Sequence, residues 1–402
     1  MSLNILYHHR TQGRGAEGLH IRSIVEALRG AGHRVTVLSP PGIDPMALDA
    51  DAPVDKAQVR TRGMQSVWKW VSRHMGGALF EAAEIAYNLP AWFRLTRELR
   101  SGRFDLVYER YAFFMVAGAM ATRRCGVPFV LEANEVSGIP HRAREQRMTR
   151  ICAAMERALL HRCTGILTVS SYLRDRIVAQ GVSLHRVHVV PNAFDMRRVS
   201  GVVKKPELAA RHGLSGNLVL GFVGWFDEWD RLDLLIQVFA RLVARRADLR
   251  LLLVGDGPVT ARLKELVAKL ELGSTVVFTG AVPRNCVLDY ASLLDVAVLP
   301  HSNDFGSPVV MFEFMGLGIP VVAPRLGPIL DVHADGQSAE LFEPLDELQL
   351  EAAIFALVNS TERRRDLAAH ALARLRRDHS WEHNARRILD AAGMTDRHRI
   401  AT

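Results

Sequence analysis

The stretch from His301 to Pro324 contains residue types that suit anion binding. A turn, Gly306-Ser307-Pro308, leads into an apolar helix that carries one acid, Glu313. Small turn residues let a backbone approach an anion closely, and the first amides of a helix are unpaired donors at the positive end of its dipole. Glu313 stands about two turns inside the helix, within reach of a pair of sugar hydroxyls. The pattern therefore suits a diphosphate attached to a sugar.

The same residues also suit an ordinary α/β crossover, in which the glycines only shape loops and Glu313 faces water. The sequence around Glu313 favours the binding site, because its neighbours Met311, Phe312 and Phe314 are apolar. A carboxylate in so apolar a helix is costly to bury without a partner. Gly318 is expected to end the helix, and the residues after it to form a buried strand.

Short apolar runs alternate with helical patterns along most of the chain, which indicates parallel sheets built from βαβ units. The expected strands of a first series are 4–8, 35–38, 106–108, 129–131, 165–169 and 187–190. Those of a second series are 218–223, 249–254, 275–279, 296–299 and 321–323.

The segment between the two series, residues 199–216, is polar and basic and is expected to be a linker. We therefore predict two doubly wound α/β domains. The first is Rossmann-like and covers 1–198, and the second, also Rossmann-like, covers 199–379. The C-terminal helices, 380–402, are expected to pack back on the first domain.

Two further loops follow expected strands of the second series. Asp256 lies in Gly255-Asp256-Gly257, and Val282 follows the strand that ends at Thr279. Ligands of doubly wound sheets bind at the carboxyl ends of the strands, so both loops are binding candidates, although either can be a simple turn. Asn192 and Asp195 are expected to hydrogen-bond local backbone, as Asx turns do.

Gly13 to Gly18 matches the pattern G-x-G-x-x-G between a strand and a helix. This pattern is typical of dinucleotide binding. Its first glycine, however, lies several residues after the end of the strand. The second strand also lacks an acid at its end, where Ser39 and Pro40 follow Leu38. We therefore favour a ligand-lining loop that contains Gly15 over a nicotinamide or flavin site.

The composition is that of a globular protein, with 402 residues, 49% hydrophobic and 23% charged. The four cysteines form no C-x-x-C pair, so we expect a reducing cytoplasm and no metal. The amino terminus lacks the order of charge and apolar residues of a secretory signal. The longest apolar run, 111–122, is shorter than the ~20 residues of a spanning helix.

The formal charge is +8, and residues 56–103 carry nine Lys or Arg. Within them, Gln65–Met75 places Trp68 and Trp70 beside basic residues, which suits contact with the inner face of an anionic membrane. A solvated basic face with inward tryptophans is the alternative. No nucleic-acid-binding motif accompanies the charge, so nucleic acid is not expected as a partner.

Seven segments taken in order resemble glycosyltransferase family 4, whose fold is GT-B. They are GAEGLHIRSIVEAL, GILTVSSYLRDRI, VVPNAFD, GFVGWFDEWDRLDLLIQVFA, LLLVGDGP, FTGAVPRNCVLDYASLLDVAVLP and FGSPVVMFEFMGLGIPVVAP. The resemblance implies two Rossmann-like domains that face each other across a cleft. It also implies a retaining transferase that uses a nucleotide-activated sugar without a bound metal or other cofactor.

The resemblance also implies roles for single residues. Glu313 would bind the ribose of the donor, Gly306-Ser307-Pro308 its diphosphate, Val282 and its neighbours the base, and Gly15 the phosphates from the first domain. Gly224, Asp256 and the positions discussed next complete the expected donor site.

This sequence departs from the family pattern at the cations expected to neutralise the diphosphate. The family has an arginine directly after the glycine of V-G, and this sequence has Trp225 there. The family has a lysine five residues later, where this sequence has Asp230. An aspartate beside a diphosphate is repulsive. A substitute cation is therefore expected, with Arg231, Arg284 and Arg325 as candidates.

Two catalytic positions differ as well. The family has a first glutamate that holds the transferred sugar, and this sequence has Phe305 at that position. The adjacent Asp304 is expected to take over its role. Where the family has a histidine in the cleft of the first domain, this sequence has Asn134, and Glu135 follows it. Since asparagine cannot act as a base, Glu135 or the departing phosphate would activate the acceptor.

The sequence therefore predicts a transferase that moves a sugar from a nucleotide diphosphate sugar, with a UDP-sugar as the expected donor, to an acceptor hydroxyl. A glycolipid, an exopolysaccharide or a glycosylated metabolite is the expected product, and the basic tryptophan segment favours a lipid-linked acceptor. The alternatives are a sugar-nucleotide epimerase or hydrolase of the same fold, and a silent binding or scaffold protein.

Overall fold

The computed structural model describes residues 2–11, 13, 15–47, 77–139, 146–333 and 337–394, and the side chain of Ala16 lies outside this description. The chain divides into two compact units. The first contains residues 1–190 and 381–402, and the second contains 191–380. None of the helices in the described ranges is both long and apolar enough to cross a membrane.

The described part of the first unit contains a parallel sheet of six strands in the order β2-β1-β3-β4-β5-β6. Its strands are β1 (Asn4–His8), β2 (Arg34–Leu38), β3 (Leu106–Arg110), β4 (Phe129–Ala133), β5 (Gly165–Thr168) and β6 (Val187–Val189). Its α-helices are α1 (Gly15–Gly30), α3 (Gly77–Ala86), α4 (Asn88–Ser101), α5 (Ala117–Cys125), α6 (Thr149–Leu160), α7 (Ser171–Val178) and α16 (Trp381–Ala391), with the 3₁₀ helix η1 (Leu184–Arg186).

The described part of the second unit contains a parallel sheet in the order β12-β11-β10-β7-β8-β9. Its strands are β7 (Leu218–Val223), β8 (Leu249–Val254), β9 (Val276–Gly280), β10 (Val296–Val298), β11 (Val321–Pro324) and β12 (Glu340–Phe342). Its α-helices are α8 (Pro206–Arg211), α9 (Leu232–Val243), α10 (Thr260–Lys269), α11 (Val287–Ala291), α12 (Val309–Leu317), α13 (Gly327–His333), α14 (Glu347–Val358) and α15 (Thr361–Asp378). The 3₁₀ helices are η2 (Met196–Val199), η3 (Glu228–Asp230) and η4 (Arg284–Cys286).

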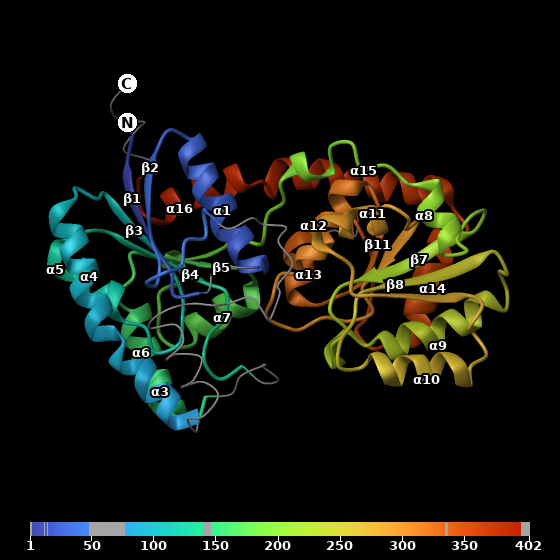
Figure 1. Ribbon diagram of the computed structural model, residues 1–402, viewed down its shortest axis with the longest axis horizontal. Coiled ribbons are helices and arrows are strands. Elements are labelled where there is room, and N and C mark those ends of the chain that lie inside the picture. The colour runs from blue at the N-terminus through green and yellow to red at the C-terminus, as the bar shows by residue number, and fades with distance from the viewer. Residues whose placement is uncertain are drawn as a thin grey trace. The chain divides into compact units, whose positions relative to one another are not determined.

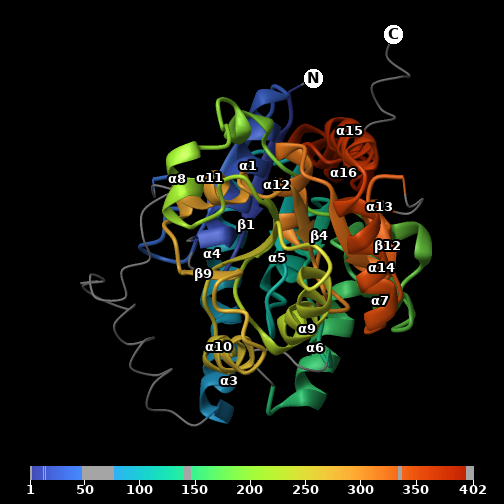
Figure 2. The same cartoon turned by 90° about the vertical axis from the view of Figure 1, so that its right-hand side faces the viewer.

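Helices cover both faces of each sheet, as parallel strands require. In the first unit α4 and α5 lie side by side, and α1 packs against α16 (Figure 1). In the second unit α9 lies beside α10, and α12 packs against α15 (Figure 2). In both sheets the strand order reverses beside the unit's first strand, between β1 and β3 and between β7 and β10. Such switch points are where doubly wound sheets bind ligands.

Residues 199–216, expected as a linker, contain helix α8 and belong to the second unit. Pro206 supplies the fixed φ of a first helical residue, while Ala209 and Leu214 are buried in the second core. Phe194 belongs to the same core. The chain therefore enters the second unit at Pro191, before the segment expected to separate the domains.

Candidate active site

The loop between β10 and α12 is shaped by Asn303. Its Oδ1 accepts hydrogen bonds from the backbone amides of Phe305, at 3.3 Å, and of Gly306, at 2.5 Å. A Cβ at Gly306 would lie 2.8 Å from the same oxygen, so glycine fits this turn where a larger residue would not. The sequence suggested that Gly306 approaches an anion, but its amide already donates within the loop.

Ser307 is held by Asn192, which lies at the start of the second unit. The backbone N–H of Asn192 donates to Ser307 Oγ at 3.2 Å. The side-chain Nδ2 of Asn192 donates to the Ser307 carbonyl oxygen at 2.7 Å. The expectation that Asn192 bonds local backbone is therefore wrong, because a distant loop offers it both partners. Asp195 does make the local bond, with the backbone amide of Arg197 at 2.9 Å.

Helix α12 begins directly after this loop, at Val309. Pro308 is its N-cap residue, and no side chain of the described residues caps the helix. The amide of Met311 donates to the Pro308 carbonyl at 3.2 Å, whereas the amides before it lie at the positive end of the helix dipole. Such a helix start suits a phosphate group. At the other end, Gly318 has φ of 69° and stops the helix, as predicted.

Glu313 is buried in α12 and has a partner that the sequence analysis missed. Arg198 Nη1 lies 3.3 Å from Glu313 Oε1. The Arg198 guanidinium also lies over the Phe194 ring, 5.3 Å from its centroid, and a Cβ at Gly316 would lie 2.7 Å from that ring. Burial raises the pKa of Glu313, although the charges of Arg198 and Arg284 oppose the rise.

The loops after β7 and β8 pack very closely. A Cβ on Gly255 would lie 1.8 Å from the Gly224 carbonyl oxygen, and a Cβ on Gly257 would lie 2.3 Å from that of Phe226. The amide of Phe226 donates to the Asp256 carbonyl at 3.0 Å. These contacts fix the backbone at the carboxyl ends of β7 and β8, and β7 borders the switch point of the second sheet.

Asp256 and Val282, two expected donor-site residues, lie in loops at this edge of the sheet. Asp256 Oδ1 accepts from Thr260 Oγ1 at 2.7 Å and from the Gly257 amide at 2.8 Å. These two bonds lower the pKa of Asp256. Val282 follows β9 and is half-buried against the second core. Asp256 thus shapes its own turn, and its exposed carboxylate remains at the edge.

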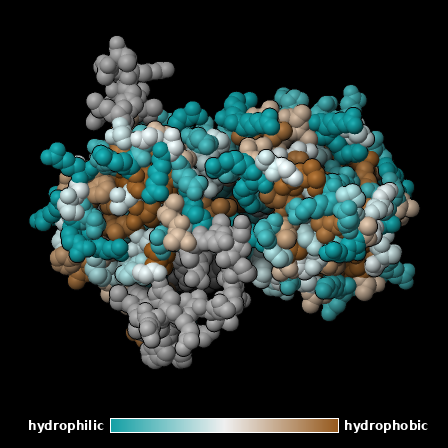
Figure 3. Space-filling model, turned by 45° about the horizontal axis from the view of Figure 1, so that its top comes forward, coloured by the Kyte–Doolittle hydropathy of each residue, from teal (hydrophilic) through white to brown (hydrophobic). Residues whose placement is uncertain are grey.

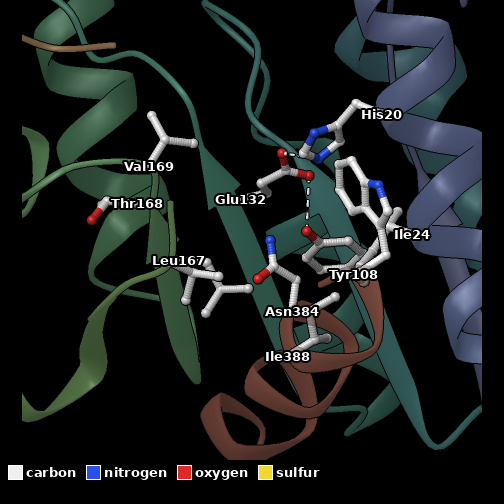
Figure 4. Close-up of a pocket in the computed structure, with 11 residues that line it drawn as sticks. His20, Ile24, Tyr108, Glu132, Leu167, Thr168, Val169, Asn384 and Ile388 are labelled. Carbon is white, nitrogen blue, oxygen red and sulfur yellow. Dashed lines mark hydrogen bonds and ion pairs between the residues drawn. The ribbon is translucent and has the colours of Figure 1, made fainter. Parts of the chain in front are cut away.

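In the first unit, Glu132 at the end of β4 is the centre of a buried polar cluster. Its Oε1 accepts from Arg110 Nη1 at 2.8 Å and Asn134 Nδ2 at 2.7 Å and lies 2.7 Å from His20 Nε2, while Oε2 accepts from Tyr108 Oη at 2.8 Å. Figure 4 shows His20 and Tyr108 pointing at this carboxylate. Burial raises the pKa of Glu132, but the charges of His20 and Arg110 and these hydrogen bonds lower it well below its usual range.

A small cavity of about 20 Å³ adjoins this cluster. Its lining includes His20, Tyr108 and Glu132 together with Trp381 and Asn384 of α16, and Figure 4 shows Asn384 below the Glu132 carboxylate. The Trp381 ring meets the His20 ring edge to face, with centroids 4.9 Å apart. The volume is enough for about one water molecule, so the cavity is a part of the polar cluster and too small for a sugar.

Asn134 and Glu135, the expected catalytic residues of the first domain, follow β4 directly. Because Nδ2 of Asn134 donates to Glu132, its Oδ1 is left as an acceptor, and this buried oxygen has no partner among the described residues. Glu135 is half-buried in the same loop. Glu156 anchors that loop by accepting from the Ser137 amide at 2.6 Å and the Ser137 hydroxyl at 2.9 Å.

Gly15 is the first residue of α1 and has φ of 61°, with open space where a Cβ would point. The preceding loop packs on the first turn of this helix, since a Cβ at Gly18 would lie 2.1 Å from the Gly13 carbonyl oxygen. Gly15 therefore leaves a bare backbone at the switch point of the first sheet. Within the described ranges, no group of three or more His, Cys, Asp or Glu side chains is arranged to hold a metal ion.

Two family models match the chain. That of Glycosyltransferase Family 4 matches residues 18–198, and that of Glycosyl transferases group 1 matches 217–360. A D-inositol 3-phosphate glycosyltransferase of Stackebrandtia nassauensis is 30% identical over 73% of this chain and 68% of its own. The chain belongs to glycosyltransferase family 4.

Other comparisons agree with this family. A 2-deoxystreptamine glucosyltransferase of Streptomyces kanamyceticus is 28% identical over 81% of this chain and 84% of its own. The crystal structure of HepE from Anabaena in complex with UDP has a TM-score of 0.71 at 18% identity and covers 98% of this chain and 100% of HepE. The two doubly wound sheets thus form a GT-B fold, and the protein is a glycosyltransferase.

The first departure from the family pattern, Trp225, is 63% exposed at the carboxyl end of β7. The second, Asp230, is half-buried and accepts from the Asp227 amide at 3.0 Å. Burial, with a contribution from the Asp227 charge, raises the pKa of Asp230 to about 7. This family 4 glycosyltransferase therefore has the exposed indole of Trp225 and the readily protonated carboxyl of Asp230 at the two positions where the family pattern has an arginine and a lysine.

Two of the three substitute cations proposed from sequence are engaged by carboxylates. Arg231 forms a two-bond pair with Asp233, at 3.0 and 3.1 Å, and Arg325 Nε lies 3.4 Å from Glu343. The positive charge of the third candidate, Arg284, opposes the rise of the Glu313 pKa, so Arg284 lies near Glu313. Arg198 and Arg284 are therefore the cations that the second unit places around Glu313.

The loop that follows β10 holds the last two expected residues. Phe305 is half-buried, and its amide donates to Asn303. Asp304, beside it, is exposed. The aromatic side chain thus occupies the position of the family's glutamate, and the nearest carboxylate in sequence faces solvent.

Proposed function

We propose that this protein transfers a sugar, with retention and without a metal ion, from a UDP-sugar to a hydroxyl of a small polyhydroxylated ring. The second unit would bind the donor and the first unit the acceptor. The product would be a glycosylated metabolite, in preference to a glycolipid or an exopolysaccharide.

The uncapped start of α12 beside the Glu313–Arg198 pair is the observation that carries the donor assignment. The free amides suit the diphosphate, and Ser307, fixed by Asn192, would contribute its hydroxyl. Glu313 would accept hydrogen bonds from the ribose hydroxyls, with Arg198 keeping its carboxylate oriented. Val282 would pack on the base. UDP is favoured because structures of HepE are described in complex with UDP and with UDP-glucose.

The names of the relatives support the acceptor class. Several are named for D-inositol 3-phosphate or for 2-deoxystreptamine, and both compounds are six-membered carbon rings with several hydroxyl groups. In the first unit, Asn134 Oδ1 has no partner among the residues that the structure describes, and it is an acceptor suited to such a hydroxyl. Glu135 is the adjacent carboxylate.

The proposed reaction breaks the bond between the anomeric carbon and the diphosphate oxygen and forms one from that carbon to the acceptor oxygen. The acceptor proton goes to the departing diphosphate or to Glu135, because Asn134 has no basic atom. The amides of α12 stabilise the negative charge that develops on the diphosphate. Asp304, in the loop that also contains Gly306, would contact the transferred sugar.

Thermal unfolding with nucleotides and their sugars, followed by a transfer assay, tests this proposal. UDP and UDP-glucose should raise the melting temperature, since a ligand at 100 times its dissociation constant stabilises by ~2.7 kcal/mol. Glu313→Ala should abolish this rise, whereas Glu265→Ala, on the exposed face of α10, should keep it. Free myo-inositol or 2-deoxystreptamine should then accept glucose from UDP-glucose.

The outcomes separate the alternatives. Consumption of UDP-glucose without any acceptor would indicate an epimerase or hydrolase, and no stabilisation by any nucleotide sugar would indicate a silent binding protein. Stabilisation by UDP that survives in Glu313→Ala would refute the placement of the donor. The tryptophan segment Gln65–Met75 lies outside the described residues, so its contact with an anionic membrane remains a prediction.

A further inference from the structure

A groove of about 640 Å³ lies on the first unit, along α4 and next to the end of α5. Trp92, Phe93, Arg97 and Arg100 of α4 and Arg124 of α5 are among the side chains that line it. We call it the α4–α5 groove. No role that we assign to the sugar-transfer reaction uses any of these residues.

The solvent face of α4 is unusually apolar at one end. Leu89 and Phe93 are four residues apart, so they lie on the same side of the helix, and they are 61% and 59% exposed. The opposite face already packs inward through Ala91, Leu95 and Leu99. Leu89 and Phe93 therefore do not contribute to the hydrophobic core of the first unit.

The other end of the same face is basic. Arg97 continues the line of Leu89 and Phe93, and Arg100 follows one turn later, while Arg123 and Arg124 are exposed on α5. No carboxylate is among the described side chains that line the groove. Arg97 makes a loose ion pair with Glu98 of the same helix, at 3.7 Å. The groove therefore suits a negatively charged partner.

Apolar side chains also reach the surface on the neighbouring helices. Leu79 of α3 is 58% exposed and Met120 of α5 is 45% exposed. On the face drawn in Figure 3, apolar surface forms patches bordered by polar side chains. An anionic membrane surface attracts exposed arginines and accepts exposed apolar side chains beside them, whereas an acidic peptide would need only the arginines.

We propose that the α4–α5 groove and the exposed face of α4 that continues from it to Leu89 dock this protein on an anionic phospholipid surface. Leu89 and Phe93 enter the boundary between headgroups and acyl chains, and Arg97, Arg100 and Arg124 contact lipid phosphates. The Trp92 ring lies against Phe93, with centroids 4.8 Å apart, and an indole suits the same depth. This proposal is independent of the donor, the acceptor and the transfer reaction.

Vesicle flotation of the full-length protein tests the proposal. The protein should float with vesicles of phosphatidylcholine and phosphatidylglycerol, and much less with phosphatidylcholine alone. Raising the salt concentration should weaken the binding, because it screens exposed charges. Each arginine near an anionic surface contributes ~1 kcal/mol, so Arg97→Gln with Arg100→Gln should lower the partition constant by about 10- to 30-fold.

The apolar part has its own variant. Leu89→Gln with Phe93→Gln should lower the partition constant by about tenfold or more, while the salt dependence of the remaining binding is kept. Matched controls lie on the second unit, where α14 exposes Leu348 and Phe355 and α15 exposes Arg376 and Arg377. Changing each control pair to glutamine should leave flotation unchanged.

Three results would overturn the proposal. The first is a wild-type protein that does not float with phosphatidylglycerol, and the second is groove variants that float as well as wild type. The third is loss of flotation in Trp68→Ser with Trp70→Ser alone, which would give the membrane contact to another segment. The melting temperature of every variant, measured without ligand, checks folding and keeps this test separate from that of the donor site.

Discussion

At the scale of single residues, the two buried carboxylates at the centre of the candidate site are matched with cations contributed by other elements. Glu313 of α12 pairs with Arg198 of η2, and Glu132 of β4 pairs with Arg110 of β3 and His20 of α1. Removing one partner of such a pair leaves a buried charge uncompensated, which costs more than the pair itself contributes. The half-buried Asp230 differs, because no cation of the described residues forms an ion pair with it and burial raises its pKa instead.

Asp230 therefore makes stability depend on pH. Its pKa is raised from 3.8 to about 7 in the folded protein, so the folded state binds more protons than the unfolded state between these values. By linkage, the contribution of the protonated Asp230 to the free energy of unfolding is fully present below pH 4. It is lost as the pH rises through 7. Asp230→Asn, which cannot ionise, should gain on the order of 2 kcal/mol relative to wild type between pH 5 and pH 8.

Urea unfolding of both proteins at the two pH values measures this difference. The control is Asp366→Asn, on the exposed face of α15, which should follow wild type at both values. Parallel pH dependence in wild type and Asp230→Asn would mean that Asp230 titrates near its ordinary pKa in the folded protein.

At the scale of elements, the close backbone approach between the loops after β7 and β8 is the feature most open to test. Gly255 has φ of 136°, and a Cβ there would overlap the Gly224 carbonyl oxygen. Gly255→Ala should therefore destabilise the protein by more than about 2 kcal/mol and weaken stabilisation by UDP, because the loop that carries Trp225 must move.

Gly273→Ala is the matched control, since a Cβ there meets nothing and its backbone needs no positive φ. Denaturant midpoints of both variants decide the matter. A Gly255→Ala protein as stable as Gly273→Ala would show that these loops can separate without cost.

The elements also show what the sequence predicts well. Strands such as Leu218–Val223 and Leu249–Val254 were predicted to the residue, because a strand covered on both faces is a continuous apolar run. Strand β12 was missed, since Glu340–Phe342 is short, lies at the sheet edge and has only one fully buried residue.

The site residues were predictable only where their signal is local. The loop before α12 and Glu313 stand out as small residues and an acid in an apolar segment. Glu132 carried a similar signal, one acid in a buried strand, but its partners His20 and Arg110 are far away in sequence, and so is Arg198 from Glu313. The incorrect role of Asn192 has the same cause, because only the fold brings Ser307 to it.

At the scale of the whole molecule, the chain leaves the first unit after Val190 and returns to it at Trp381. Helix α16 then completes the first core with Ala385 and Ile388. Its end packs tightly on β5, since a Cβ at Gly165 would lie 2.3 Å from the Ala391 carbonyl oxygen. The last helix is therefore a structural part of the unit formed by the start of the chain.

Truncating a buried side chain of α16 should thus destabilise the first unit. Ile388 is 1% exposed, and Ile388→Ala should cost about 3 kcal/mol through lost burial and the cavity left behind. Ile151→Ala, at an exposed position of α6, should cost less than about 0.5 kcal/mol. Hydrogen exchange should locate the change in β1, β3 and β5, which face this core. If Ile388→Ala unfolds at the same denaturant concentration as Ile151→Ala, the core of the first unit closes without α16, and the return of the chain has a role other than stability.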